Sequence, residues 1–319
     1  MSKIIFLTGA AGFVGYHLAK SLHARGDKVL GYDNFNDYYD VNLKRARAKE
    51  LRTLGVEVVE GDICNSDQLE DIMSALRPTH VAHMAAQAGV RYSIENPMAY
   101  VKSNLEGFVN ILEACRRHPG TSLIYASSSS VYGANAKLPF SVTDETNEQV
   151  SLYGATKKSN EVLAASYHHL YNMPVTGLRF FTVYGPWGRP DMAYYSFTKA
   201  IMESRPIKVF NFGKLQRDFT FIDDIIAGTV SAIDLSAQHE IFNLGNNKPV
   251  PLEHFIDVVE HAVGKKAIRE ELPMQPGDVP ATYANIDHSK QLLGFEPKTK
   301  LEDGIPKFVQ WYKQWAPSQ

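Results

Sequence analysis

Cysteine is scarce in this chain of 319 residues, which contains only Cys64 and Cys115. The two lie far apart and lack the spacing of metal ligands, so neither a disulfide framework nor a cysteine-based metal site is expected. His80 and His83 would lie on one strand, where positions i and i+3 point to opposite faces, so a shared metal is not expected either. We therefore predict no bound metal and a reducing, cytoplasmic location.

Strong net charge and long apolar runs are missing too. The 33 Lys and Arg residues nearly balance the 35 Asp and Glu residues, and the net charge of −2 gives no electrostatic reason to expect nucleic acid. No uninterrupted apolar run approaches the roughly 18 residues of a membrane span. Gly9 and Gly12 interrupt the N-terminal apolar run, which is therefore not typical of a signal peptide. We expect neither nucleic acid nor a membrane as a partner.

A glycine-rich turn follows the first predicted strand. The apolar run 3–8 leads into Gly9-Ala10-Ala11-Gly12-Phe13-Val14-Gly15, after which a helical pattern begins. Glycine lets a ligand approach the backbone closely, and the N–H groups that open a helix carry roughly half a positive charge. The pattern predicts a pyrophosphate cradle at Gly9, Gly12, Phe13, Val14 and Gly15. The alternative is a glycine-rich turn without a ligand.

The second predicted strand, 28–32, ends in Asp33, roughly 20 residues beyond the cradle, as dinucleotide-binding sequences require. A carboxylate there accepts hydrogen bonds from ribose hydroxyls and repels a 2′-phosphate, which favours NAD over NADP. A solvated strand end is the alternative for Asp33. The strand 56–62 offers Asp62 near adenine, and the strand 81–86 ends in small residues that suit a dinucleotide.

Basic residues are densest at 44–49, where Lys and Arg alternate with alanine on a predicted helix. We interpret this cluster mainly as a solvated helical face. The alternative is a loop that closes over the cofactor.

Strands and helices alternate up to about residue 181, which predicts a Rossmann-type, doubly wound parallel sheet. Helices are expected at 66–76, 97–117 and 153–171, and further strands at 123–128 and 175–181. The Pro- and Gly-rich segment 184–190 then leads into a smaller α/β substrate domain. We predict a discontinuous division: residues 1–183 and 214–246 form the NAD-binding domain, and 184–213 and 247–319 form the nucleotide-sugar-binding domain.

The glycine spacing of the cradle resembles that of the extended short-chain dehydrogenase/reductase superfamily, which uses Tyr-x-x-x-Lys on a helix after the fifth strand. Three such pairs occur: Tyr16/Lys20, Tyr153/Lys157 and Tyr195/Lys199. Only Tyr153 follows a strand that ends in hydroxyl side chains at the carboxyl edge, where ligands of open α/β sheets bind. Ser128 takes the superfamily's catalytic serine position. We predict Ser128, Tyr153 and Lys157 as the catalytic residues; a helix-surface pair beside a Ser-rich loop is the alternative.

These residues suit alcohol oxidation. Lys157 lies one helical turn from Tyr153, and its ammonium together with a nicotinium charge favours the phenolate. Tyr153 would remove a proton from a substrate hydroxyl, and Ser128 would hydrogen-bond the same oxygen. Ser129-Ser130-Val131-Tyr132-Gly133 lacks the Asp-Glu pair typical of dehydratases and the Glu typical of decarboxylases. A ketone formed here has re-reduction as its obvious fate, and hydride return to the opposite face is epimerisation.

Four longer runs are similar to those of UDP-glucuronate 4-epimerases, and the resemblance covers essentially the whole chain. They are Tyr32-Asp33-Asn34-Phe35-Asn36-Asp37-Tyr38-Tyr39-Asp40, Gln87-Ala88-Gly89-Val90-Arg91-Tyr92-Ser93, Gly185-Pro186-Trp187-Gly188-Arg189-Pro190-Asp191-Met192 and Gln275-Pro276-Gly277-Asp278-Val279. The resemblance implies that UDP-glucuronate and UDP-galacturonate are interconverted, and that a homodimer forms through 97–117 and 153–171. Thr182 further supports the acid, because galactose 4-epimerases usually carry Asn there.

The resemblance also implies contacts for both ligands. Further NAD contacts are expected from Asn34, Asn36, Ile63, Ala85, Ala86, Gln87 and Asn104, beside Tyr153 and Lys157. The nucleotide sugar is expected to meet Arg91, Ser128, Ser129, Ser130, Thr182, Arg189, Phe210, Arg217 and Asp278. Arg189 and Arg217 would offset the diphosphate, and Asp278 would accept from the uridine ribose. Surface or interdomain salt bridges are the alternative for the arginines, and a core position is the alternative for Phe210.

Other functions stay open on the sequence alone. A UDP-hexose 4-epimerase or a UDP-glucuronate decarboxylase would use the same triad. An NAD-binding sensor or scaffold is the non-enzymatic alternative.

Overall fold

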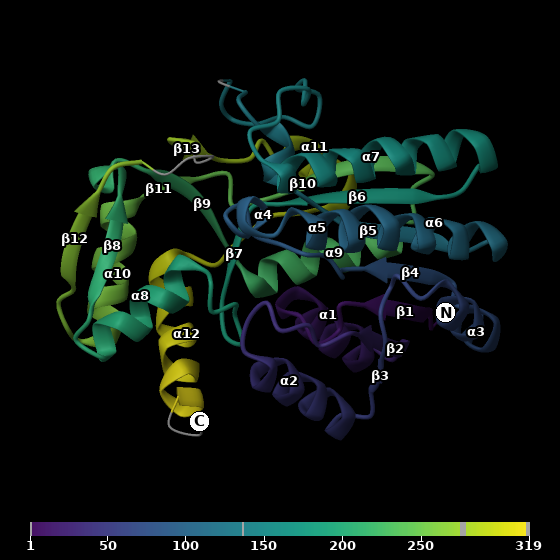
Figure 1. The fold of residues 1–319 in the computed structure, drawn as a ribbon, viewed down its shortest axis with the longest axis horizontal. Coiled ribbons are helices and arrows are strands. Elements are labelled where there is room, and N and C mark those ends of the chain that lie inside the picture. Colours follow the sequence, from purple (N-terminus) through teal and green to yellow (C-terminus); the bar gives the residue numbers. More distant parts are fainter. Residues whose placement is uncertain (1, 136, 275–278, 317–319) are drawn as a thin grey trace.

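The computed structural model describes residues 2–135, 137–274 and 279–316. Its largest element is a seven-stranded, entirely parallel sheet in the order β3-β2-β1-β4-β5-β6-β10 (Figure 1). The strands are β1 (Ile4–Thr8), β2 (Lys28–Asp33), β3 (Glu57–Glu60), β4 (His80–His83), β5 (Ser122–Ser128), β6 (Val175–Phe180) and β10 (His239–Leu244). The chain reverses its direction of travel across the sheet between β1 and β4, and ligands of such folds bind at this switch point.

Helices cover both faces of this sheet, which explains why its strands are apolar on both sides. On one face lie α3 (Ser66–Leu76), α6 (Gly107–Arg117) and α7 (Leu152–Tyr171), which contact one another in sequence. On the other face lie α1 (Phe13–Ala24), α9 (Ile222–Leu235) and α11 (Asp287–Leu293), with α2 (Val41–Thr53) beside α1. The predicted Rossmann-type, doubly wound sheet is confirmed.

The helix expected at 97–117 is present, but it is not uniform. It runs through α5 (Pro97–Tyr100), a π-helical segment (Val101–Glu106) and α6, and the short helix α4 (Tyr92–Glu95) precedes it. Asn104 lies within the π-helical segment and is buried. Such π-helical turns are rare and frequently occur at functional sites.

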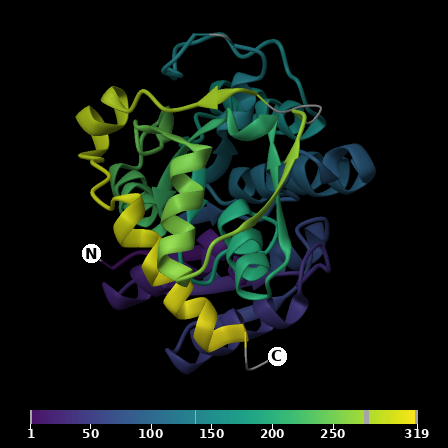
Figure 2. The same ribbon diagram turned by 90° about the vertical axis from the view of Figure 1, so that its left-hand side faces the viewer.

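Two smaller sheets and three helices form the other side of the molecule (Figures 1 and 2). One sheet contains β7 (Thr182–Tyr184), β9 (Gln216–Phe221), β11 (Pro249–Pro251) and β13 (Ala281–Thr282); the other pairs β8 (Pro206–Phe210) with β12 (Ile268–Leu272). The helices α8 (Ala193–Met202), α10 (Leu252–Val263) and α12 (Leu301–Trp315) pack beside them.

The chain crosses between the two parts more than once. Within the segment 214–246, β10 joins the large sheet, whereas β9 pairs with strands of the smaller sheet. The predicted domain boundaries stay a prediction.

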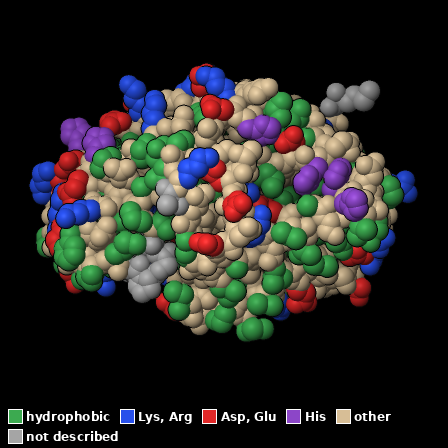
Figure 3. Space-filling view, turned by 90° about the horizontal axis from the view of Figure 1, so that it is seen from above, with side chains coloured by type: hydrophobic (Ala, Val, Ile, Leu, Met, Phe, Trp, Pro, Cys, Tyr) green, Lys and Arg blue, Asp and Glu red, His purple; other side chains and the backbone are tan. Residues whose placement is uncertain are grey.

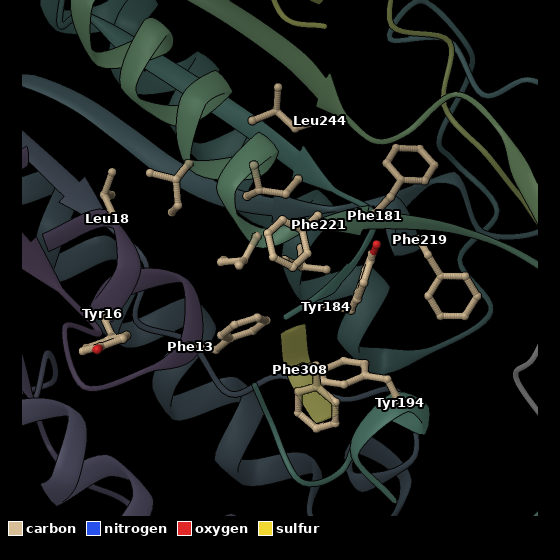
Figure 4. Packing of buried hydrophobic residues seen from close by; sticks show 14 of the residues in the cluster. Phe13, Tyr16, Leu18, Phe181, Tyr184, Tyr194, Phe219, Phe221, Leu244 and Phe308 are labelled. Atoms are coloured by element: carbon tan, nitrogen blue, oxygen red, sulfur yellow. The ribbon is translucent and has the colours of Figure 1, made fainter. Parts of the chain in front are cut away.

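Aromatic packing joins the two parts through one shared hydrophobic cluster (Figure 4). Phe13 and Tyr16 of α1 lie in the same buried cluster as Tyr184, Tyr194 and Phe308. Phe308 of α12 packs edge-on against Tyr194 of α8, with ring centroids 4.9 Å apart. Burial of such large rings stabilises the arrangement by roughly 1.5–3 kcal/mol per side chain.

Acidic and basic side chains are interspersed on the face shown in Figure 3. None of the helices in the described part of the chain combines the length and the hydropathy that a membrane span needs.

Candidate active site

A pocket opens at the carboxyl edge of the large sheet, at the switch point between β1 and β4. Residues from the ends of β1, β2, β4, β5 and β6 line it. Of the predicted cofactor and catalytic residues, the lining includes Gly9, Gly12, Phe13, Val14, Gly15, Asp33, Asn34, Asn36, Ile63, Ala85, Ala86, Gln87, Ser128, Tyr153 and Lys157. Of the predicted substrate residues, Ser128 and Arg189 line it.

The cradle requires glycine at two positions. Gly9 has φ +73°, and a Cβ there would lie 2.6 Å from the backbone nitrogen of Ala85. A Cβ at Gly15 would lie 2.0 Å from the carbonyl oxygen of Gly9. No side chain caps α1 at Gly12, so the helix presents its N-terminal N–H groups to the pocket. This geometry suits the pyrophosphate of a dinucleotide.

Asp33 lies buried at the end of β2 and helps to build the cradle. Its Oδ2 accepts from the Ala11 N–H at 2.9 Å, and its Oδ1 accepts from the Phe35 N–H at 2.9 Å. Burial raises the pKa of this carboxyl group, while the two backbone bonds and the charge of Lys44 counteract the shift. A carboxylate offers about four lone-pair positions, so it can still accept from a ribose diol. The residues therefore fit NAD.

Ser128, Tyr153 and Lys157 all line the pocket. Ser128 ends β5, and Tyr153 and Lys157 follow the N-cap of α7, where Ser151 accepts from the Gly154 N–H at 3.0 Å. Lys157 is buried, and its Nζ donates to the Ala126 carbonyl at 2.8 Å. The helix thus brings the phenol and the ammonium to the serine on the strand end.

The two basic groups of this trio have shifted pKa values. Burial raises the pKa of Tyr153 above its ordinary value, whereas the hydrogen bond with Ser128 and the charge of Arg189 lower it. Burial lowers the pKa of Lys157 to about 8, against the opposing charge of Glu161. Perturbed titratable groups gathered in one cleft are typical of catalytic sites.

The other two Tyr/Lys pairs lie outside the pocket lining. Lys20 Nζ is 3.1 Å from the Tyr16 hydroxyl but pairs with Glu50 at 2.7 Å, and Tyr16 is fully buried. Tyr195 is buried against Phe308 of α12, with ring centroids 5.7 Å apart.

The prediction that residues 44–49 form a solvated helical face is wrong for Lys44 and Arg47. Lys44 lines the pocket, and its Nζ donates to the Asn36 carbonyl at 2.6 Å. Burial lowers the pKa of Lys44 to about 8. Arg47 is fully buried, and Lys49 on the same helix is exposed. The Lys/Arg pattern does not reveal this difference, because the acceptors for Arg47 come from distant segments.

Two predicted cofactor residues lie just behind the lining. Asn104 accepts from the Gln87 N–H at 2.8 Å and donates to the Gln87 carbonyl at 2.9 Å, so it holds the backbone of a lining residue. Asp62 accepts from Asn34 Nδ2 at 3.1 Å, and its neighbour Ile63 lines the pocket.

Arg189 approaches the pocket as part of a polar group. It forms an ion pair with Asp191, with Nη2–Oδ2 at 2.6 Å, and the Tyr38 hydroxyl donates to the same carboxylate at 3.1 Å. Tyr38, Tyr39 and Ser103 also line the pocket, although none of them was among the residues predicted for the site. Tyr38 and Tyr39 belong to the run 32–40, which resembles UDP-glucuronate 4-epimerases, and this resemblance could have indicated their place in the site.

The remaining substrate candidates among the described residues lie on several elements outside the pocket lining. The Arg91 guanidinium lies over the Phe210 ring, 5.0 Å from its centroid. Arg217 of β9 donates to the Gln216 carbonyl at 2.9 Å. Ser129 and Ser130 form the turn after Ser128, Thr182 begins β7, and Asp278 lies outside the described residues.

His80 and His83 make separate contacts. His83 Nδ1 is 2.7 Å from the Thr8 hydroxyl, and His80 Nε2 is 2.8 Å from the Ser236 hydroxyl. Within the described ranges, no three His, Cys, Asp or Glu side chains gather as metal ligands would.

Comparison with known proteins agrees with this site. Residues 5–245 match the NAD dependent epimerase/dehydratase family. UDP-glucuronate 4-epimerase 4 of Arabidopsis thaliana is 49% identical over 97% of this chain and 75% of its own length. The crystal structure of UDP-glucuronic acid 4-epimerase from Bacillus cereus, in complex with UDP-glucuronic acid and NAD, has a TM-score of 0.91. It is 34% identical and covers 98% of this chain and 99% of its own.

A neutral-sugar enzyme is also similar. The UDP-glucose 4-epimerase of Thermotoga maritima, solved with UDP-glucose, has a TM-score of 0.87 at 28% identity over 98% of this chain and 99% of its own. The higher identity to the glucuronate enzymes confirms the resemblance found in the sequence. The chain belongs to the NAD dependent epimerase/dehydratase family and, within it, to the UDP-glucuronate 4-epimerases.

Proposed function

We propose that this protein interconverts UDP-glucuronate and UDP-galacturonate by NAD-dependent epimerisation at C4, and is thus an isomerase. The main support for this proposal is that the glycine-rich turn and the residues Ser128, Tyr153 and Lys157 line the same pocket. Its relatives act on this substrate, and one was solved with it and NAD.

NAD, when bound, would supply a hydride acceptor for C4 and, once the 4-keto sugar has rotated, a hydride donor for its opposite face. The protein moves the proton and steadies the oxygen. Tyr153 takes the proton of the 4-hydroxyl and later gives it back. Ser128 donates a hydrogen bond to the same oxygen as it becomes a carbonyl. Lys157, one turn along α7, supplies positive charge that favours the phenolate while its Nζ is anchored on Ala126.

The substrate residues divide by chemistry. Arg189 and Arg217 bind the diphosphate, Asp278 the uridine ribose, and Phe210 with Arg91 the uracil side of the site. Thr182, Ser129 and Ser130 bind the carboxylate near the sugar ring plane. This matters because the 4-keto form of a uronic acid is a β-keto acid, which loses CO₂ when its carboxylate bond aligns with the carbonyl π system. Support for Arg189 comes from its position on the pocket lining.

The cofactor contacts follow the pocket. Gly9, Gly12 and Gly15 cradle the pyrophosphate, Asp33 accepts from the adenosine ribose, and Ile63 lies with Asp62 on the adenine side. Asn104 acts through Gln87, to which it is bonded twice.

A homodimer is part of the proposal. Exposed apolar side chains gather on α4–α5, on the π-helical segment and on α7: Ile94, Met98, Val101, Val162, Leu170 and Tyr171. Met98 is 67% and Val162 58% exposed, which is high for an unpartnered helix surface. Light scattering should give a dimer, and Met98→Glu with Val162→Glu should give monomers. A monomeric wild-type protein would contradict this part.

Cytoplasmic location and the two-domain division complete the proposal. Both cysteines are free thiols, which fits a reducing compartment. Residues 1–183 with 214–246 bind NAD, and 184–213 with 247–319 bind the nucleotide sugar. The placement of β10 in the large sheet supports the return of the chain to the first domain.

The test is to incubate the purified protein with UDP-glucuronate, without added reductant, and to follow the products by NMR. UDP-galacturonate alone is expected. Release of CO₂ with a UDP-pentose would indicate a decarboxylase instead. Turnover of UDP-glucose but not of UDP-glucuronate would indicate a hexose epimerase, and no turnover of any UDP-sugar would leave an NAD-binding sensor or scaffold.

A further inference from the structure

Arg47 of α2 joins two segments that are far apart in the sequence. Its side chain is fully buried. Nη1 donates to the Ala11 carbonyl of the cradle turn at 2.9 Å and to the Tyr39 hydroxyl at 2.8 Å. Nη2 donates to the carbonyls of Trp187 at 2.6 Å and Gly188 at 3.1 Å. Nε also donates to the Trp187 carbonyl, at 3.1 Å. One guanidinium therefore bonds both the cradle and the two residues that precede Arg189.

His17 of α1 extends this contact by one residue. Its Nε2 lies 2.9 Å from the Pro186 carbonyl, which can only accept, so Nε2 is the donor. Three successive carbonyls, at 186–188, thus accept from α1 and α2. Trp187 has φ +60°, which is uncommon for a bulky residue, and its ring packs on Tyr16 with centroids 5.3 Å apart. These contacts hold an otherwise unfavourable backbone in place.

We propose that Arg47 is a positioning residue that fixes the Arg189-bearing segment against the cofactor cradle and so serves the binding of both diphosphates. This inference rests on the proposed function, in which Arg189 meets the UDP diphosphate and the cradle meets that of NAD. Arg47 acts on the two ligands in different ways. Its positive charge behind Ala11 favours the NAD pyrophosphate, and its planar fork orients the backbone that leads to Arg189.

Charge and fork can be separated by substitution. Lysine at position 47 keeps a cation, but an ammonium on a flexible stem lacks the rigid set of five donors that spans several carbonyls. Methionine keeps much of the apolar stem and removes both the charge and the donors. Arg47→Met should therefore weaken the binding of both NAD and UDP. Arg47→Lys, in comparison, should restore NAD binding but not UDP binding. Burial of Arg47 alone would not produce this split.

Calorimetric titration with NAD, and with UDP on the NAD-loaded protein, tests the inference. Arg47→Met should raise both dissociation constants about tenfold or more. Arg47→Lys should bring the NAD constant near the wild-type value and leave the UDP constant raised. Lys49→Met is the matched control, since Lys49 is an exposed residue on the same helix, and it should change neither constant. Hydrogen exchange should become faster at 185–192 in Arg47→Met, with core strands such as β5 unaffected.

The inference is overturned if Arg47→Met leaves the UDP constant within about twofold of that of Lys49→Met. It is also overturned if Arg47→Lys fully restores UDP binding, because charge would then suffice. If Arg47→Met does not fold, Arg47→Lys takes its place: a UDP dissociation constant within about twofold of that of Lys49→Met would overturn the inference. A wild-type protein that binds neither NAD nor UDP would instead refute the proposed function.

Discussion

Arg179 of β6 and Glu161 of α7 form a buried, two-pronged ion pair directly behind the strand end that carries Ser128. Nε–Oε1 and Nη2–Oε2 are both 2.8 Å, and each side chain is less than 5% exposed. The Ser127 hydroxyl also donates to Glu161 Oε1, at 2.7 Å. Glu161 lies one helical turn beyond Lys157 on the same face of α7, so the pair fixes α7 against β6, and the Ser127 bond adds β5.

Glu161→Ala should strongly destabilise the protein, because it leaves the Arg179 guanidinium buried without this carboxylate. Loss of one partner of a buried ion pair costs about 3–5 kcal/mol. Urea unfolding monitored by circular dichroism measures the change. Lys290→Met, which breaks an exposed ion pair with Glu296, is the control and should leave stability nearly unchanged. Equal stability of the two variants would argue against a structural role of the Arg179–Glu161 pair.

Tyr153→Phe should lower turnover of UDP-glucuronate by roughly 10²–10⁴-fold, the usual contribution of a general base. Packing is almost unchanged, so the melting temperature should stay near that of the wild type. Ser128→Ala should act in the same direction. Tyr195→Phe is the matched control, because Tyr195 heads the competing pair and packs on α12. If Tyr195→Phe abolished the reaction and Tyr153→Phe did not, the choice of catalytic pair would be wrong.

Asp33→Ala should weaken NAD binding by about 1–3 kcal/mol, because a polar partner of the ribose is lost. Some stability should be lost as well, since the N–H groups of Ala11 and Phe35 lose their acceptor. Fluorescence titration with NAD and with NADP measures the first effect. The wild-type protein should prefer NAD, and equal or better activity with NADP would refute the assigned role of Asp33.

Thr182→Val should slow epimerisation or allow leakage to a UDP-pentose, because the carboxylate of the 4-keto form loses a partner that keeps it near the ring plane. NMR of the reaction mixture distinguishes the two products. Thr198→Val, at a buried threonine that donates within α8, is a control for the loss of a hydroxyl. Unchanged rates and products in Thr182→Val would remove Thr182 from the site.

Acid should weaken the fold partly through His17, whose pKa is lowered to about 4 by burial. Below about pH 6.5 the unfolded chain gains a proton at this residue, whereas the folded protein does not until about pH 4. Stability should therefore fall as the pH drops through this window, by at most about 3 kcal/mol from His17. His17→Gln keeps a hydrogen-bond donor for the Pro186 carbonyl, and its stability should fall less steeply with acid. Some loss should remain, because His80 and His83 still contribute to it. A loss of stability in His17→Gln as steep as that of the wild type would contradict this account.

Local rules in the sequence were enough to predict the glycine turn, the position of Asp33 at a strand end, and the strand and helix that carry Ser128, Tyr153 and Lys157. A glycine turn between a strand and a helix, a carboxylate at the next strand end, and a Tyr/Lys pair at i and i+4 each depend on few neighbouring residues. Because parallel strands end at a common edge, their carboxyl-terminal residues meet in space. The doubly wound sheet and the pocket at its switch point follow from that alternation of elements.

Long-range contacts decided what the sequence left open. The pattern at 44–49 is the same whether the residues are solvated or buried, and only the fold brings the carbonyls of Trp187 and Gly188 to Arg47. The pairing of Arg179 with Glu161 likewise depends on how β6 packs against α7. A charged side chain is buried only where partners arrive to replace its water, and those partners come from distant parts of the chain. The tertiary structure therefore determined which cationic side chains are buried, whereas the sequence alone determined the fold class, the glycine turn after the first strand and the Tyr/Lys spacing.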